Sequence, residues 1–280
     1  MEYLERRVSM VEDRLESVVD AIDPAVLSDE VAHVALSGGK RVRPAVTILA
    51  CEACGGAPED AVDFAVAVEL VHNASLVVDD IIDRSDVRRG TESAWSAFGH
   101  GPALIASDGL LGEAFALLAA DEHATEIVAE SMVELGEGEA TELVARPTNE
   151  AEYMQLARRK TGALFRASAE VGAVAGGADP FTIDLFGEYA ERVGVAFQIR
   201  DDVLDATADA TDLGKPTGQD AAMDRPSLIQ VTALSDTEAN ERAHNESQQA
   251  LDALAAANID DTESLGYLRD LAEFVVIRER

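Results

Sequence analysis

The segment that decides the fold of this chain is AVDFAVAVELVHNASLVVDDIID at residues 61–83. Its apolar residues recur at spacings of three and four, the period of an amphipathic helix, and the apolar run ends in Asp79, Asp80 and Asp83. The same combination returns at residues 193–205, VGVAFQIRDDVLD, where a second apolar stretch ends in three aspartates. We therefore expect two long helices that each carry an Asp-Asp-x-x-Asp motif near one end.

Outward from these two segments, most of the chain shows the same helical spacing. Breakers containing Gly and Pro separate the stretches, and runs of alternating β-branched residues typical of strands are missing. The stretches with helical spacing are 61–82, 103–120, 126–144, 151–175, 182–207 and 247–256. Because no linker or repeat divides the chain, we expect a single all-α domain over residues 1–280, a bundle of roughly ten helices.

The composition argues against several classes of function. The chain has 54 Asp and Glu residues against 22 Lys and Arg, a net charge of −32, and such an acidic surface repels nucleic acid and anionic membranes. No uninterrupted apolar run reaches ~18 residues, the length of a membrane-spanning helix. The charged N-terminus lacks the apolar core of a signal sequence. We expect no nucleic-acid partner, no integral membrane segment and a cytoplasmic location.

Lysine is rare in this chain, which contains only Lys40, Lys160 and Lys215. Low lysine, abundant carboxylates and 5% aromatic residues resemble the composition of proteins from high-salt cells. If lysine is excluded from the surface, the three that remain are expected where a compact ammonium group is required.

The two aspartate motifs predict a metal site. Residues four apart share one face of a helix, so Asp79 lies with Asp83, and Asp201 with Asp205. Like charges at this spacing repel, and a hard divalent cation with oxygen ligands relieves the repulsion. Mg²⁺ suits such a site because it keeps waters and bridges to phosphate. The alternative, an acidic surface, predicts scattered carboxylates rather than two copies of one motif flanked by Leu, Val and Ile.

Basic residues near the aspartate motifs predict phosphate binding. Glycines allow close approach of the backbone to an anion, and clustered Lys and Arg side chains supply the charge. The clusters are SGGKRVRP at 37–44, RRG at 88–90, RRKTG at 158–162 and GKP at 214–216. All three lysines fall in these clusters.

In this arrangement the sequence resembles the trans-isoprenyl diphosphate synthases, also called the polyprenyl synthetase family. The matching segments, in the family's order, are GGKRVRP at 38–44, ELVH at 69–72, DDIID with RRG within 79–90, KTGALF at 160–165, FQIRDDVLD at 197–205 and GKPTGQD at 214–220. The resemblance implies an isoprenoid synthase-like all-α bundle around a deep central substrate cavity, usually as a homodimer. It also implies a Mg²⁺-dependent prenyltransferase that condenses isopentenyl diphosphate with an allylic diphosphate.

The resemblance also implies a role for each matching residue. Isopentenyl diphosphate would be bound by Lys40, Arg43, His72 and Arg89. Up to three Mg²⁺ ions would be held by Asp79, Asp83, Asp201 and Asp205. The allylic diphosphate would be contacted by Arg88, Lys160, Thr161, Gln198 and Lys215. We expect the catalytic set to be Asp79, Asp83, Asp201, Lys160 and Lys215. One segment departs from the family: Arg225 stands where many members have a lysine that contacts the allylic diphosphate, so Arg225 is a further expected ligand.

The residues before the first aspartate motif bear on product length. In the family the growing chain runs beside this helix, and bulky residues one to two turns before the motif stop growth early. Here those positions are the small residues Ala74 and Ser75, with Val71 a turn further back. We therefore expect no dedicated C15 synthase and favour the C20 product, geranylgeranyl diphosphate, with longer chains as the alternative.

Two rival functions stay open at this point. A class I terpene cyclase also ionises allylic diphosphates with Mg²⁺, but it needs one diphosphate site rather than two. A catalytically silent partner subunit would be expected to lose aspartates, whereas both motifs are complete. A redox or zinc role for Cys51 and Cys54 lacks a second cysteine pair or a nearby histidine at zinc spacing, so we expect both to pack in a helix.

Overall fold

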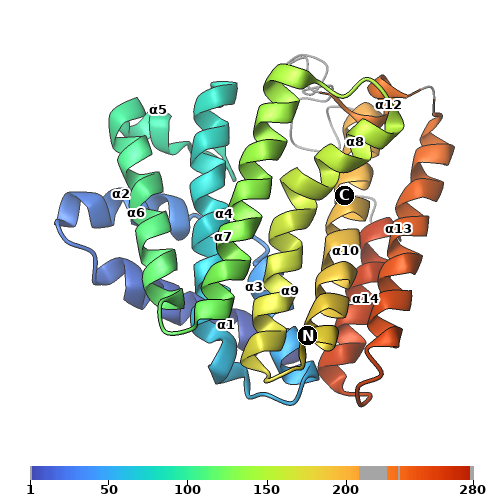
Figure 1. Ribbon diagram of the computed structural model, residues 1–280. Helices are drawn as coiled ribbons and strands as arrows, with labels where there is room; N and C mark the ends of the chain where they lie inside the picture. Colours follow the sequence, from blue (N-terminus) through green and yellow to red (C-terminus); the bar gives the residue numbers. More distant parts are fainter. Residues whose placement is uncertain (1, 208–225, 233, 278–280) are drawn as a thin grey trace.

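The computed structural model describes residues 2–207, 226–232 and 234–277, and its regular structure is almost entirely helical (Figure 1). The predicted all-α fold is confirmed. The elements are α1 (Glu2–Asp20), α2 (Ala25–Ala35), α3 (Val42–Ala53), η1 (Pro58–Ala61), α4 (Val62–Asp83), β1 (Val87–Arg88), β2 (Thr91–Glu92), α5 (Ala94–Phe98), α6 (His100–Leu118), α7 (Glu122–Ala140), η2 (Thr141–Ala145), α8 (Glu150–Ala157), η3 (Arg158–Gly162), α9 (Ala163–Ala175), α10 (Pro180–Thr207), α12 (Leu228–Val231), α13 (Asp236–Ala256) and α14 (Glu263–Ile277).

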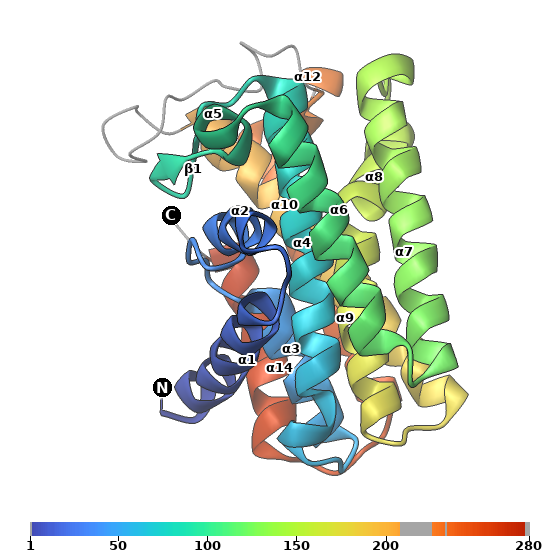
Figure 2. The same cartoon turned by 90° about the vertical axis from the view of Figure 1, so that its left-hand side faces the viewer.

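Three helices, α4, α9 and α10, form the middle of the bundle (Figures 1 and 2). Helix α4 packs against α6 and α3, α9 packs against α3, α7 and α10, and α10 packs against α13. Helices α4, α7 and α10 all run toward the upper end of the bundle in Figure 1, and η3 leads into α9 from that same end. Both aspartate motifs and the basic segment 158–162 are therefore carried to one end of the bundle.

The apolar periodicity of the sequence becomes two clusters of buried side chains. One surrounds α4 and includes Leu70 and Leu110, and the other surrounds α10 and includes Phe186 and Leu268. Helix α9 supplies residues to both clusters, as does α3. Burial of such side chains stabilises the fold by ~1.5–3 kcal/mol each, so the positions of the helix ends above them are firmly set.

The structure departs from the sequence expectation at two places. A short antiparallel hairpin, β1 with β2, follows α4, although no strand was expected. Its two-residue turn, Arg89 and Gly90, has φ values of 52° and 82°, which is the left-handed geometry of tight hairpins. The predicted continuous helix 151–175 is divided into α8, the π-helical turn η3, and α9. The strands β1 and β2 were not predicted because two residues are too few to show an alternating pattern.

Two helical segments, Pro58–Asp83 and His100–Leu118, are long and apolar enough to cross a membrane by length and composition alone. The most apolar window of the first is 61% buried inside the protein, as expected for a core helix, whereas that of the second is only 33% buried. Both segments contain charged residues, such as Asp63 and Asp108, so neither has an uninterrupted apolar run of ~18 residues, the length that spans a membrane. The absence of an integral membrane segment stays a prediction.

Candidate functional site

The first aspartate motif lies in the last turn of α4, and the hairpin folds back onto it. Arg84 ends the helix in the left-handed region, with φ of 53°. The chain then turns so that Arg88 reaches Asp80: Nη2 of Arg88 lies 2.5 Å from Oδ1 of Asp80, and Nε lies 3.0 Å from the same oxygen. This two-pronged contact fixes the hairpin against the helix.

The structure separates the middle aspartate of each motif from the outer ones. Asp80 and Asp202 are buried, each 3% exposed. The outer aspartates Asp79, Asp83 and Asp205 are partly exposed and Asp201 is exposed. The middle carboxylates therefore serve the protein interior, and the outer ones lie where a metal ion and a diphosphate can approach.

Asp202 is the centre of a buried hydrogen-bond network. Its carboxylate accepts hydrogen bonds from the hydroxyl of Tyr153 (2.5 Å) and the backbone N–H of Leu228 (2.8 Å). It also accepts one from the side-chain amide of Gln198 (2.9 Å), whose carbonyl oxygen accepts from the hydroxyl of Thr161 (2.8 Å). The predicted ligands Thr161 and Gln198 are thus brought together. Tyr153 is a member that sequence reasoning missed, since no motif marks it.

Lys160 lies between carboxylates. Its Nζ is 3.1 Å from Oε1 of Glu139 and hydrogen-bonds to Glu142. Burial lowers the pKa of Lys160, but Glu142, Glu139 and Asp79 outweigh this and leave the pKa raised. The ammonium group therefore stays charged at neutral pH and lies within the electrostatic reach of the first aspartate motif.

Two π-helical turns create this arrangement. Glu142 belongs to η2, at the end of α7, and Lys160 to η3. Gly138, in the last turn of α7, allows η3 to approach α7 closely, because a Cβ at that position would lie 3.0 Å from the backbone nitrogen of Lys160. Single π-helical turns are frequent at functional sites, since the extra residue re-aims a side chain. Glu139 and Glu142 were not predicted from the sequence, where they are two among many acidic residues.

The outer aspartates fit a hard cation such as Mg²⁺. Among the described residues no group of three or more His, Cys, Asp or Glu side chains is close enough to hold a metal by itself. The motifs can instead offer carboxylate oxygens in pairs, and Mg²⁺ typically takes one or two carboxylates and completes its shell with water and substrate phosphate. Accessible pairs of carboxylate oxygens at the end of a helix are consistent with this coordination.

A second set of residues is cationic and lies on α3, α4 and the hairpin. Arg43 is partly buried, and its Nη1 lies 3.3 Å from Nε2 of His72, which must accept the hydrogen bond because a guanidinium has no acceptor. Burial lowers the pKa of Arg43 to about 10. Burial, together with Arg43, also holds the pKa of His72 well below its usual 6.5, so His72 is neutral. Nε of Arg43 has no hydrogen-bond partner among the described residues.

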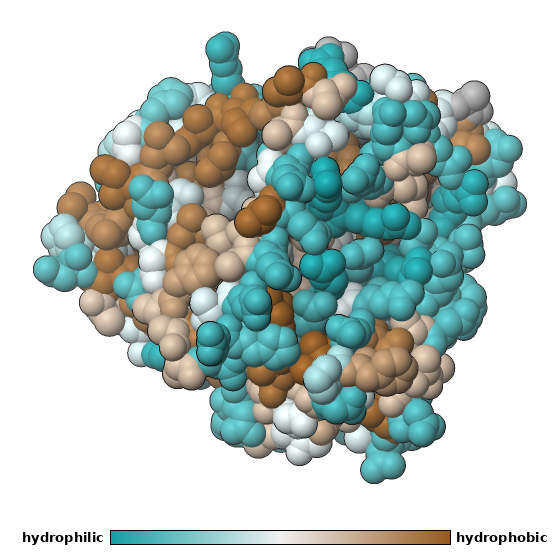
Figure 3. All heavy atoms as spheres, in the orientation of Figure 1, coloured by the Kyte–Doolittle hydropathy of each residue, from teal (hydrophilic) through white to brown (hydrophobic). Residues whose placement is uncertain are grey.

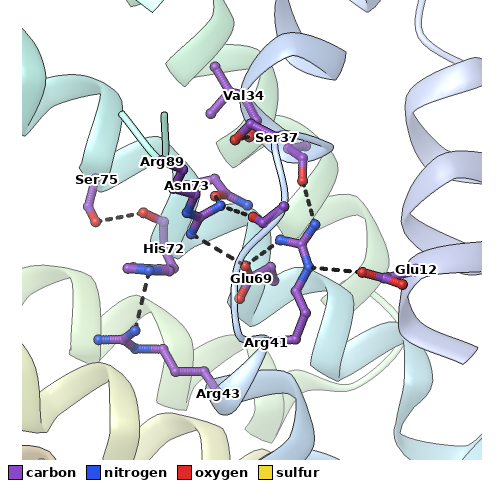
Figure 4. Close-up of polar contacts among 12 residues, drawn as sticks. Glu12, Val34, Ser37, Arg41, Arg43, Glu69, His72, Asn73, Ser75 and Arg89 are labelled. Carbon is purple, nitrogen blue, oxygen red and sulfur yellow. Dashed lines mark hydrogen bonds and ion pairs between the residues drawn. The ribbon is translucent and has the colours of Figure 1, made fainter. Parts of the chain in front are cut away.

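Arg89 completes this cationic set (Figure 4). Its guanidinium donates to the backbone carbonyl of Gly38 and lies 3.4 Å from Oδ1 of Asn73. Gly39 makes this approach possible, since a Cβ there would lie 2.9 Å from the guanidinium carbon. Lys40 follows on the same loop with its side chain exposed. The structure therefore brings Arg43, His72 and Arg89 together and places Lys40 on the adjoining loop.

The residues expected to limit product length lie on α4 below the first aspartate motif. Ser75 is one turn from Asp79 on the same face, since residues four apart differ by only 40° around a helix. Its hydroxyl donates to the carbonyl of His72 (2.8 Å). Ala74 is buried against α6, where its carbonyl accepts a hydrogen bond from Ser107 (3.2 Å), and Val71 is buried as well. No aromatic residue occupies these three positions.

Cys51 and Cys54 lie at the end of α3 and form no disulfide. Burial raises the pKa of Cys51 to about 12 and that of Cys54 to about 11. Both thiols are therefore protonated and unreactive at neutral pH. The predicted ligands Lys215 and Arg225 lie outside the described residues.

Known proteins resemble this chain in sequence and in overall fold. The family model described as polyprenyl synthetase matches residues 24–263. A geranylgeranyl diphosphate synthase from Methanosarcina mazei is 34% identical over 244 residues, which cover 84% of this chain and 75% of that protein. A geranylgeranyl pyrophosphate synthetase structure from Pyrococcus horikoshii superposes with a TM-score of 0.86 and 32% identity, over 99% of this chain and 98% of that one. A decaprenyl diphosphate synthase structure from Rhodobacter capsulatus gives 0.90 and 28%, over 100% and 98%. This chain belongs to the polyprenyl synthetase family.

Proposed function

We propose that the protein is a trans-isoprenyl diphosphate synthase. It joins isopentenyl diphosphate to an allylic diphosphate and releases inorganic diphosphate. The observation that carries this proposal is the pairing of two chemically opposite sets of side chains on α4. Asp79 lies within electrostatic reach of Lys160, Asp83 follows one turn later at the end of the helix, and His72 lies two turns lower among arginines. A chain with two such sets suits two diphosphate substrates, which a terpene cyclase does not need.

The acidic set serves the ionisation of the allylic substrate. Mg²⁺ ions, up to three, would be held by Asp79, Asp83, Asp201 and Asp205. When bound, they neutralise the charge that develops on the departing diphosphate. Lys160, Arg88, Thr161 and Gln198 would add hydrogen bonds to the same diphosphate, and Lys215 and Arg225 are proposed to do so as well.

Arg88 is well placed for this role because its side chain is held by Asp80 yet is 36% exposed. The pair with Asp80 uses Nε and Nη2, which leaves Nη1 able to turn toward an anion. Lys160 would exchange part of its contact with Glu142 for a phosphate oxygen. The protein therefore keeps both cations oriented before the substrate arrives, which lowers the cost of binding.

The cationic set would bind the diphosphate of isopentenyl diphosphate through Lys40, Arg43, His72 and Arg89. This holds its double bond beside the allylic carbocation, so that bond formation becomes an intramolecular event. The allylic carbon–oxygen bond breaks first, the double bond then attacks the carbocation to form the new carbon–carbon bond, and the adduct loses a proton to the released diphosphate. No side-chain nucleophile is required.

We propose C20, geranylgeranyl diphosphate, as the main product. The small residues Ala74, Ser75 and Val71 leave no aromatic floor at the depth that would stop a C15 chain. Longer products are the alternative, and a decaprenyl diphosphate synthase is among the structural neighbours.

We also propose a homodimer. Helix α6 presents apolar side chains to solvent, with Leu104 49% and Ile105 56% exposed, and Phe98 and Val133 on the neighbouring helices are exposed as well. Figure 3 shows hydrophobic residues gathered on the left-hand side of the molecule, where α5 and α6 lie in Figure 1. Continuous apolar surface of this kind commonly marks a protein interface. Replacing Leu104 and Ile105 by Lys should yield a monomer in sedimentation analysis, and an unchanged mass would reject this interface.

The composition supports a cytoplasmic enzyme of a high-salt cell. A net charge of −32 keeps a protein soluble but makes its compact form repel itself, and counterions relieve that repulsion. We therefore expect the free energy of unfolding to rise with salt.

One assay tests the proposed function. Purified protein is incubated in molar salt and Mg²⁺ with labelled isopentenyl diphosphate and allylic primers of five, ten and fifteen carbons. We expect chain extension and release of diphosphate, with C20 as the main product. If the folded protein extends none of the primers, it is a catalytically silent subunit rather than a synthase.

A further inference from the structure

Glu69 lies between the guanidinium groups of Arg41 and Arg89 (Figure 4). It is on α4, one turn before His72, and it is 2% exposed. Nη1 of Arg41 donates to its carboxylate at 2.6 Å, and Nη2 of Arg89 lies 4.0 Å from the same oxygen. A single buried carboxylate therefore faces two arginines from different segments of the chain.

Both terminal nitrogens of Arg41 donate hydrogen bonds. Its side chain is 2% exposed, and besides Glu69 it donates to the backbone carbonyl of Ala35 (2.8 Å) and lies 3.9 Å from Glu12. Arg41 also adopts a left-handed backbone conformation, φ 48°, at the start of α3. These contacts tie together α1, the end of α2 and α4 around the loop that carries Lys40.

The charges of this region need a counter-ion when no substrate is bound. Arg41 is buried, Arg43 is partly buried, the side chain of Arg89 is 21% exposed, and His72 stays neutral among them. Buried charges of like sign repel strongly where water is excluded. Glu69 favours the charged forms of both Arg43 and Arg89, which opposes the effect of burial.

We propose that Glu69 and Arg41 are positioning residues for the isopentenyl diphosphate site. Glu69 holds the guanidiniums of Arg41 and Arg89 in place, and Arg41 fixes the loop of Lys40 and the first turn of α3, so that Arg43, His72 and Arg89 face one diphosphate. Neither residue touches the substrate. This inference rests on the proposed function, because it concerns the same site.

A merely stabilising ion pair would make a different prediction. Removal of such a pair lowers the free energy of unfolding and leaves the affinity for each of the two substrates unchanged. Removal of a positioning pair weakens only the diphosphate that the arranged arginines receive. The affinities for isopentenyl and allylic diphosphates must therefore be compared in the same variant.

The chain offers a matched control. Glu52 forms a second largely buried pair, with Arg7 at 2.5 Å and with the hydroxyl of Tyr3 at 2.9 Å. The two side chains of that pair are 13% and 11% exposed, and the pair joins α1 to α3 away from the arginines of the site. Glu52→Gln should lower stability and leave the KM values of both substrates unchanged.

The experiment compares Glu69→Gln with Glu52→Gln and wild type. For Glu69→Gln we expect the KM for isopentenyl diphosphate to rise about tenfold or more, the allylic KM to stay within about twofold, and kcat to change little. The dissociation constant of isopentenyl diphosphate, measured by calorimetry with a metal chelator present, should rise in parallel. This binding measurement does not require turnover, so it stands even if wild type fails to extend chains and the proposed function falls.

A double variant guards against simple unfolding. Arg41→Met combined with Glu69→Met replaces the buried pair by apolar side chains, a change that often preserves stability. We expect this variant to keep a melting temperature near that of wild type and still to bind isopentenyl diphosphate about tenfold more weakly. If either Glu69→Gln or the folded double variant binds isopentenyl diphosphate like wild type, or more tightly, the proposal is overturned. An equal loss for both substrates overturns it too.

Discussion

The division of the first aspartate motif into an inward and an outward carboxylate makes a sharp prediction. Asp79→Asn and Asp80→Asn each remove one negative charge from neighbouring positions and leave the shape of the side chain nearly unchanged. Asp79 is partly exposed and Asp80 is buried. We expect Asp80→Asn to reduce stability and Asp79→Asn to reduce turnover.

The magnitudes follow from the contacts. Arg88 reaches Asp80 with two nitrogens, Nη2 at 2.5 Å and Nε at 3.0 Å. Breaking a fully buried pair costs ~3–5 kcal/mol and an exposed pair ~0–1 kcal/mol. Because Arg88 is 36% exposed and asparagine keeps one acceptor, we expect Asp80→Asn to lower the free energy of unfolding by ~1–3 kcal/mol.

The opposite is expected at Asp79. Loss of its charge relieves repulsion from Asp83 four residues later but also removes attraction to Lys160, so the two effects offset and the free energy of unfolding should change by less than ~0.5 kcal/mol. Turnover should fall ~10²–10³-fold, as for other lost transition-state contacts, and more Mg²⁺ should be needed for half-maximal activity.

Urea denaturation and a Mg²⁺ titration of activity, done on both variants in one buffer, test this prediction. Asp80→Asn should shift the urea midpoint with an unchanged slope, and its Mg²⁺ requirement should match that of wild type. The reasoning is refuted if the two variants lose similar stability, or if Asp80→Asn raises the Mg²⁺ requirement as much as Asp79→Asn does.

Four further predictions concern other parts of the site and the core. Tyr153→Phe removes the hydroxyl that donates to Asp202 and should cost ~1.5–3 kcal/mol in urea denaturation; a loss below ~0.5 kcal/mol would show that the network does not need it. Glu142→Gln removes a carboxylate partner of Lys160 and should alter the KM of the allylic substrate or kcat, but not the KM of isopentenyl diphosphate. Unchanged kinetics would exclude a role of Glu142 in orienting Lys160. Ser75→Phe places a ring one turn below Asp79 and should shift products toward C15; the same product lengths would place the floor elsewhere. Burial raises the pKa of Glu170 to about 7, above its unfolded value, so it favours folding at low pH and this contribution is lost as pH rises toward 7. Glu170→Gln should therefore flatten the stability profile between pH ~4.5 and ~7, and an unaltered profile would contradict the shift.

Much of the fold followed from helical periodicity. The expected helices 61–82 and 182–207 correspond to Val62–Asp83 and Pro180–Thr207, because apolar faces continue to the ends of both. Periodicity failed where a helix is mostly polar. Helix α13 was expected only over 247–256 but begins at Asp236, where the Ser235 and Glu238 side chains form a capping box.

The site was harder to predict wherever a residue acts through a distant partner. The aspartate motifs and RRG are visible as local patterns. The partner of Asp202 is not, since Tyr153 and Asp202 are 49 residues apart and the pairing depends on how α8 meets α10. Glu69 and Arg41, 28 residues apart, lie within the matching segments 69–72 and 38–44, but their pairing becomes visible only in the fold, which buries them together.

The most direct test of the two-site account is equilibrium binding to wild-type protein with and without Mg²⁺. Isopentenyl diphosphate should bind with one-to-one stoichiometry even in the presence of a metal chelator, because Arg43, Arg89 and Lys40 supply the positive charge. A non-ionisable allylic diphosphate analogue should bind only when Mg²⁺ is added, because its site is lined by Asp79, Asp83 and other carboxylates that repel a bare anion. If both ligands require Mg²⁺ equally, or if the allylic analogue binds equally well in chelator, the separation into a cationic and a metal-dependent site is wrong.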